Sequence, residues 1–126
     1  MYAERHRVAI TTESDGTGIG YTPEIRGRVL EVVYTKPQSG GFADGVDFTI
    51  VGAFTRTNVW TEQDVNTSKT VRPLAASHGT DGVALEDGAA APIAVAPVVL
   101  VGERLEIAVA SGGTGGETGT FDVVVI

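Results

Sequence analysis

Apolar side chains recur at every second position early in the stretch FADGVDFTIVGAFTRTNVWTE, residues 42–62. Val46, Phe48 and Ile50 alternate with polar residues, which is the period of a β-strand with one buried face. An Asp-Gly turn precedes this strand, and a second short strand follows with the only tryptophan, Trp60. Neither strand carries a reactive group, so this segment is expected to serve packing.

Strand-like segments of the same kind fill most of the chain, separated by clusters of Gly, Pro, Asn, Asp and Ser. We expect strands over residues 5–12, 25–36, 46–51, 57–62, 92–101, 105–110 and 120–126, with one more inside 64–77 that ends before Pro73. The sequence therefore predicts an all-β, single-domain antiparallel β-sandwich, jelly-roll or immunoglobulin-like, of about seven or eight strands over residues 1–126. Alternation alone leaves a barrel open, and residues 78–91 are expected to form a long loop or, over 83–91, one helical turn.

The expected core follows from the inward positions of these strands. It comprises Val46, Phe48, Ile50, Trp60, Leu105, Ile107, Val109 and Phe121. In the strand 25–36 strict alternation would place Gly27, Val29, Glu31 and Val33 on one face, and Arg26, Arg28, Leu30, Val32 and Tyr34 on the other. Gly27 is a candidate for a bulge or bend within that strand.

Composition excludes several classes of protein. A chain of 126 residues can bury a real core, and the lack of cysteine excludes disulfides and thiolate sites. The net charge of −7 argues against nucleic acid as a partner. The charged N-terminal segment does not resemble a signal peptide, and no apolar run approaches a membrane span, so we expect a soluble protein made in a cytoplasm, with no membrane partner.

The charge is unevenly distributed. Residues 1–36 hold five basic and five acidic side chains, whereas residues 37–126 hold four basic and eleven acidic ones. One interpretation is a solubilising surface. The other is that the arginine-bearing part docks on an acidic partner while the acidic part faces solvent.

A search for reactive constellations leaves no catalytic, cofactor-binding or metal site. The glycine-rich stretch 111–119 lacks the Gly-Lys-Ser/Thr and the following helix of a phosphate loop. The neighbours Ser77 and His78, with Asp81 nearby, point in different directions on an extended chain. The carboxylate pairs Glu62/Asp64 and Glu86/Asp87 lack the aromatics that line a sugar cleft. The carboxylates at 44 and 47 flank a turn, and those at 81, 86 and 87 cluster on an expected loop. Calcium could bind such groups, but they do not have the spacing of an EF-hand.

The chain resembles small structural proteins of tailed bacteriophages and related proviruses. The resemblance rests on the succession Ile25-x-Gly27, Val33-Tyr34-Thr35-Lys36, FADGVDFTI at 42–50, Val59-Trp60-Thr61-Glu62, Val65-Asn66, Arg72-Pro73, ERLEI at 103–107 and Gly119-Thr120-Phe121. It extends from about residue 27 to the end of the chain.

This resemblance implies a non-enzymatic virion component on the capsid surface, namely a capsid decoration (minor head) protein bound to the major capsid protein. Other positions in the particle, in the head–tail connector or the tail, stay open, as does a carbohydrate- or host-surface-binding module with an exposed Trp60 or Tyr34. Self-association into a dimer or trimer is expected, although no residue determines the number. We expect Arg5, Arg7, Arg26 and Arg28, on alternate positions of two strands, to contact the shell.

Overall fold

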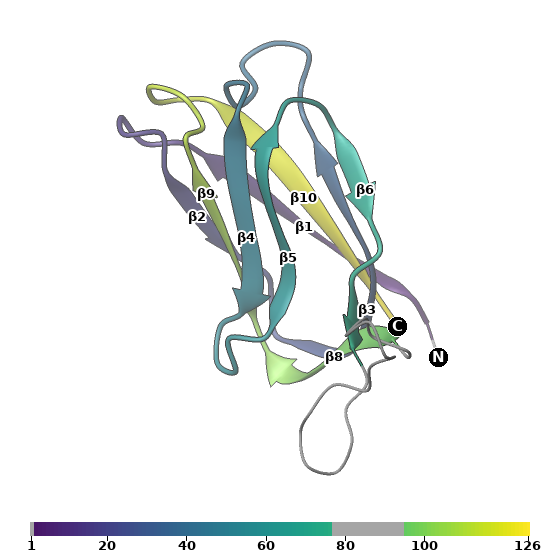
Figure 1. The fold of residues 1–126 in the computed structure, drawn as a ribbon. Coiled ribbons are helices and arrows are strands. Elements are labelled where there is room, and N and C mark those ends of the chain that lie inside the picture. Colours follow the sequence, from purple (N-terminus) through teal and green to yellow (C-terminus); the bar gives the residue numbers. More distant parts are fainter. Residues whose placement is uncertain (1, 77–94) are drawn as a thin grey trace, which may run out of the picture.

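The computed structural model describes residues 2–76 and 95–126, which form ten strands and no helix. The strands are β1 (Glu4–Thr11), β2 (Gly18–Tyr21), β3 (Ile25–Thr35), β4 (Val46–Gly52), β5 (Asn58–Val65), β6 (Lys69–Val71), β7 (Leu74–Ala76), β8 (Val95–Glu103), β9 (Leu105–Ala110) and β10 (Thr118–Val125). They build two antiparallel sheets in two layers (Figure 1). The predicted all-β sandwich is thus confirmed. The expected loop or helical turn at 78–91 lies outside the described residues.

The order of the strands is that of a jelly roll. One sheet runs β1-β10-β3-β8-β7, with β6 beside β3, and the other runs β2-β9-β4-β5. The strand pairs β1·β10, β2·β9, β3·β8 and β4·β5 are nested one inside the next along the chain. A long antiparallel ribbon wound across two sheets gives this nesting, so the structure decides between the two sandwich types left open by the sequence.

Two strands were not expected from the sequence, β2 and β7. Strand β2 lies in the cluster SDGTGIG, whose composition is that of a turn. A Cβ on Gly18 or Gly20 would lie 2.6 Å from the side chain of Ile10 or Val8, both in β1. The two glycines therefore let β2 cross close to β1 where the sheets meet, and their role is close approach rather than a turn.

The strict alternation expected for β3 is wrong. Ile25, Val29, Val32 and Tyr34 are all buried. The buried positions are odd-numbered up to Val29 and even-numbered from Val32, so the inward face shifts by one residue between them. The register with β10 shifts at the same place, between Val124 and Val125. A bulge therefore reverses the faces within β3.

Gly27 marks a second special position of β3, as expected for a bend. Its φ of +124° is one that a side chain rarely adopts, and a Cβ there would lie 2.6 Å from the carbonyl oxygen of Ile126. Arg28 and Ile126 exchange two backbone hydrogen bonds of 2.9 and 3.0 Å. Gly27 thus lets residue 126 pair closely with β3.

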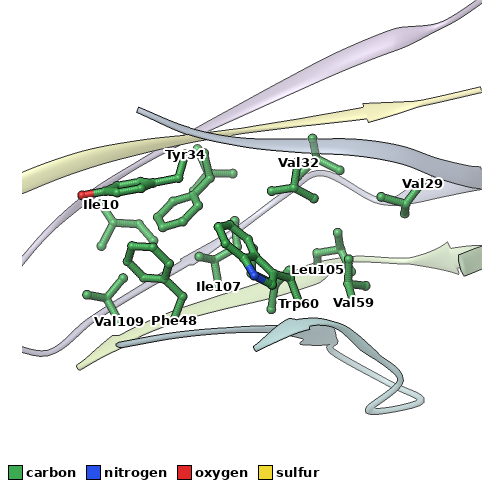
Figure 2. Packing of buried hydrophobic residues seen from close by; sticks show 14 of the residues in the cluster. Ile10, Val29, Val32, Tyr34, Phe48, Val59, Trp60, Leu105, Ile107 and Val109 are labelled. Carbon is green, nitrogen blue, oxygen red and sulfur yellow. The ribbon is translucent and has the colours of Figure 1, made fainter. Parts of the chain in front are cut away.

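Aromatic side chains fill the space between the sheets (Figure 2). The ring of Phe48 lies edge-on to those of Tyr34, Phe121 and Trp60, at centroid distances of 4.6, 5.0 and 5.6 Å. All eight residues expected in the core are buried, and Trp60 is 7% exposed. The Trp60 indole N–H donates to the Glu62 carboxylate, so a buried ring keeps a polar partner at the rim of the core.

Candidate interaction surface

The four arginines singled out by the sequence lie on one surface, the outer face of the six-stranded sheet. In β1 the side chains of Val8 and Ile10 point into the core. Arg5 and Arg7 lie at the alternate positions of the strand, so their side chains point outward. In β3 exposed Arg26 and Arg28 alternate with buried Ile25 and Val29. We call this surface the arginine face; β10 lies between its two arginine pairs.

The β1 side of the arginine face is electrically paired. The Asp122 carboxylate, on β10, accepts hydrogen bonds from Arg7 Nε at 2.8 Å and Arg7 Nη2 at 3.1 Å, and a longer one from Arg5 Nη1 at 3.4 Å. The Asp122 side chain is 4% exposed, whereas those of Arg5 and Arg7 are 57% and 65% exposed. Two exposed cations therefore cover one buried anion.

This pairing changes the acidity of both partners. The hydrogen bond from Arg7 is the largest cause that holds the pKa of Asp122 below its usual range, and together with the charges of Arg7 and Arg5 it outweighs the opposing effect of burial. The same hydrogen bond to Asp122 raises the pKa of Arg7. Arg7 is thus largely committed to a contact inside the molecule, and Arg5 lies 3.4 Å from the same carboxylate.

The β3 side of the arginine face is less fully paired. Arg26 Nη2 contacts Glu24 Oε1 at 2.9 Å, with both side chains more than half exposed. The exposed Arg28 side chain contacts no carboxylate within residues 2–76 and 95–126. Among the described residues, Arg28 is therefore the one of the four arginines that has no carboxylate partner.

Exposed valines accompany these two arginines. In the register of β3 with β8, Arg26 lies opposite Val101 and Arg28 opposite Val99. Val99 is 59% and Val101 80% exposed. Direct cross-strand neighbours project on the same face of a sheet, so the four side chains form one patch of two cations and two apolar groups. We call it the β3–β8 strip.

The sequence contains a signal for the exposed apolar side chains of this strip, which was not used when a strand was expected over residues 92–101. Residues 95–101, VAPVVLV, have no polar side chain at all. Such a run is typical of a strand that is covered on both faces. In the structure only its inner residues Val98 and Leu100 are buried, which leaves the outer valines in solvent.

Two acidic side chains, Glu117 and Glu103, accept hydrogen bonds from the backbone of loops. The Glu117 carboxylate accepts from the Thr12 hydroxyl at 2.6 Å and from the backbone N–H of Gly115 at 2.8 Å, bonds that lower the pKa of Glu117. Burial alone would raise the pKa of Glu103, but hydrogen bonds from Thr55 and Phe54 reverse the shift. The glycine-rich stretch 111–119 thus holds a carboxylate of its own where a phosphate loop would hold its ligand.

The other candidate metal-binding and catalytic residues either have different partners in the structure or lie outside the described residues. No group of three or more His, Asp or Glu side chains that could hold a metal occurs among the described residues. Asp44 pairs with Lys36, and Asp47 accepts the backbone N–H of Asp64. The candidates at 77, 78, 81, 86 and 87 lie outside the described residues.

A depression of about 510 Å³ borders the β3–β8 strip at the end of the sandwich where both termini lie (Figure 1). It is lined by Tyr2, Glu4, Glu24, Arg26, Gly27, Val125 and Ile126. Its charged groups are exposed and mixed in sign, so it has no built polar site of its own. No helix long and apolar enough to cross a membrane occurs in the described part of the chain.

Comparison with known proteins gives little. No family model matches the chain, and no curated protein matches it in sequence. The crystal structure of FLHE is similar in shape, with a TM-score of 0.44 and 12% sequence identity over 98% of this chain and 96% of that chain. A similarity at this level carries no argument about function.

Proposed function

We propose that this protein is a non-enzymatic structural protein that docks on an acidic protein surface through the arginine face. In the setting that the family resemblance implies, it is a capsid decoration protein on the head shell of a tailed phage, with the major capsid protein as its partner. It acts as a small homo-oligomer, a dimer or trimer. In this proposal the functional site is a binding surface that makes non-covalent contacts and carries out no reaction.

The observation that carries the proposal is the charge of the arginine face. This face gathers Arg5, Arg7, Arg26 and Arg28 in a chain whose net charge is −7. Opposite charge on a partner would speed the encounter and determine the register of the two surfaces. A rigid two-layer sandwich presents such a face without the ordering cost that a flexible segment would incur on binding.

The mechanism follows from mass action. A protein that binds the assembled shell better than its loosened form stabilises the assembled form by the difference in binding free energy. Many copies on a repeating lattice make modest single contacts sufficient, and an oligomer adds avidity. Other places in the particle, such as the head–tail connector or the tail, would use the same contact on a different partner.

The carbohydrate-binding alternative requires an exposed aromatic platform at Trp60 or Tyr34. These side chains are 7% and 1% exposed and lie between the sheets (Figure 2). Neither ring can stack on a sugar without opening the core, so no observation favours this alternative.

Co-sedimentation with empty heads tests the proposal. The heads are assembled from a major capsid protein of the genome that encodes this chain, and the test variant carries glutamine at positions 5, 7, 26 and 28. We expect the wild type to sediment with the heads and this variant to lose at least tenfold in affinity, since the four cations that attract an acidic partner are removed.

The matched control carries glutamine in place of Lys36, Arg56, Lys69 and Arg104, which removes the same charge elsewhere and should bind as the wild type does. Circular dichroism checks that both variants are folded. The proposal is wrong if the wild type does not bind heads, or if the two variants bind equally.

A further inference from the structure

The two arginine pairs of the arginine face differ in what they can offer a partner. Arg7 already makes a bidentate contact with the buried carboxylate of Asp122, and Arg5 lies beside it. Drawing Arg5 and Arg7 toward a partner would leave that buried anion without its cations, which is unfavourable. The β1 pair is therefore poorly suited to carry a contact.

The β3 pair lies in a different setting. Arg28 contacts no carboxylate in the described part of the chain, and it stands between two apolar neighbours, Val99 on β8 and Ile126 on the other side. A cation between apolar groups is a frequent feature of protein contacts, where arginine and apolar side chains are enriched and the other charged residues are depleted. The setting of Arg28 therefore suits a contact centre rather than a solvated rim.

The apolar part of the β3–β8 strip continues beyond the two valines. Leu74 in β7 and Val95 at the start of β8 are 57% and 53% exposed, and the β7–β8 pairing brings their strands together. From Val95 to Val101, β8 spans about 20 Å at ~3.3 Å per residue. An exposed apolar band of this length on a sheet marks a binding surface or an aggregation hazard.

We propose that the β3–β8 strip is the contact centre of the docking surface, and that it takes a protein surface presenting a carboxylate to Arg28 among apolar side chains that cover Val99 and Val101. This inference rests on the proposed function and narrows it. Arg5 and Arg7 then act inside the molecule by neutralising Asp122, and Arg26, held by Glu24, borders the contact.

Charge decides between this partner and the other occupants of such a strip. A second copy placed by a two-fold axis over the strip would bring Arg28 near Arg28 of its mate, and like charges oppose that arrangement. An anionic membrane attracts clusters of several basic residues and aromatic anchors. The strip holds two arginines, one of them paired with Glu24, and no aromatic residue, so a protein with an acidic and apolar surface fits it better.

Binding to the same empty heads tests the inference with three variants and one control. Val99→Thr combined with Val101→Thr keeps the shape and β-branching of both side chains but adds two hydroxyls. We expect a loss of at least tenfold in affinity. Arg28→Gln should lose at least fivefold. Arg5→Gln with Arg7→Gln should lose less affinity than Arg28→Gln alone. The control Lys36→Gln with Arg56→Gln, which breaks ion pairs with Asp44 and Glu106 outside the arginine face, should bind within threefold of the wild type at a temperature where all variants are folded.

The outcomes separate this inference from the proposed function. If the wild type binds and the quadruple glutamine variant does not, but the threonine variant and Arg28→Gln bind normally, the β3–β8 strip is not the contact centre while arginine-face docking survives. If the wild type does not bind heads, the proposed function itself fails.

Two further measurements use the wild type and the threonine variant. Sedimentation velocity shows whether the threonine changes convert an oligomer to a monomer, which would assign the strip to a second copy. Flotation with vesicles of phosphatidylcholine and phosphatidylserine shows whether the wild type binds an anionic membrane through Val99 and Val101. Either result overturns the inference. An unchanged oligomeric state and no flotation, with lost binding to heads, support it.

Discussion

Replacing Asp122 by asparagine tests how the arginine face is held together. The carboxylate is 4% exposed and accepts two short hydrogen bonds from Arg7, whose own side chain is 65% exposed. A hydrogen bond to a charged group contributes about 1.5–3 kcal/mol to stability. Because asparagine leaves no cavity and the freed guanidiniums can regain water, we expect a loss at the low end, about 1.5–2 kcal/mol.

Urea unfolding at pH 7, followed by the fluorescence of Trp60, measures this loss. With a slope of ~1–3 kcal/mol per molar urea, the midpoint should fall by about 1 M. The matched control is Glu24→Gln, which breaks the exposed contact with Arg26. Exposed pairs contribute about 0–1 kcal/mol, so this control should stay within about 0.5 kcal/mol of the wild type.

The dependence on pH gives a second reading of the same change. The folded-state pKa of Asp122 lies below that of the unfolded chain, so the contribution of its charge is complete above the unfolded value of about 3.9 and is lost as pH falls through the folded pKa. The stability difference between wild type and Asp122→Asn should therefore be constant above about pH 5 and shrink below about pH 4. A loss no larger than that of the control, or a difference that grows in acid, would refute the reasoning.

Two substitutions between the sheets have opposite expected signs. The Tyr34 hydroxyl is buried without a hydrogen-bond partner in the described residues, and burial raises its pKa to about 12. Tyr34→Phe should therefore leave stability unchanged or raise it by up to about 1 kcal/mol, and should remove the most alkaline step from a tyrosine titration at 295 nm; a clear loss would mean that the hydroxyl has a partner. Phe48 is 1% exposed and packs against four aromatic rings, so Phe48→Ala should cost about 3–5 kcal/mol in urea unfolding. Phe54→Ala, at an 87% exposed site, should change stability by less than about 0.5 kcal/mol, and equal effects at the two sites would contradict the assigned core.

The jelly-roll order helps to explain why one sheet face is open to binding. Nesting the strand pairs buries the inner faces of both sheets against each other, and within residues 2–76 and 95–126 no further layer covers either outer face. The fold by itself assigns no function, because jelly rolls serve many unrelated ones. In this chain the assignment rests on which residues occupy the outer face.

Several elements could be predicted because their signals are local. The alternation of Val46, Phe48 and Ile50, and of Leu105, Ile107 and Val109, determined where those strands run and which side chains they bury. Period-two patterning is a property of neighbouring residues, so it survives without knowledge of the partner strand. The class of the fold followed from the repetition of this pattern.

Other elements could not be predicted because their cause lies far away in the chain. The segment that forms β2 has the composition of a turn. It runs as a strand because Gly18 and Gly20 have no side chain to clash with Ile10 and Val8 of β1. The bulge in β3 depends on the register of β10, about ninety residues later. No local pattern encodes which partner a strand will meet, so both features were missed.

The arginines show most clearly what each level determined. The sequence by itself established an all-β chain with balanced charge near its start and acidic charge after it, and it identified four arginines at alternate strand positions. Tertiary structure alone decided that these arginines share one face and that Arg7 binds the carboxylate of Asp122. It also placed Val99 beside Arg28 and Val101 beside Arg26. The physical reason is that a side chain's alternation is local, whereas its neighbours across a sheet are chosen by strand pairing between distant segments.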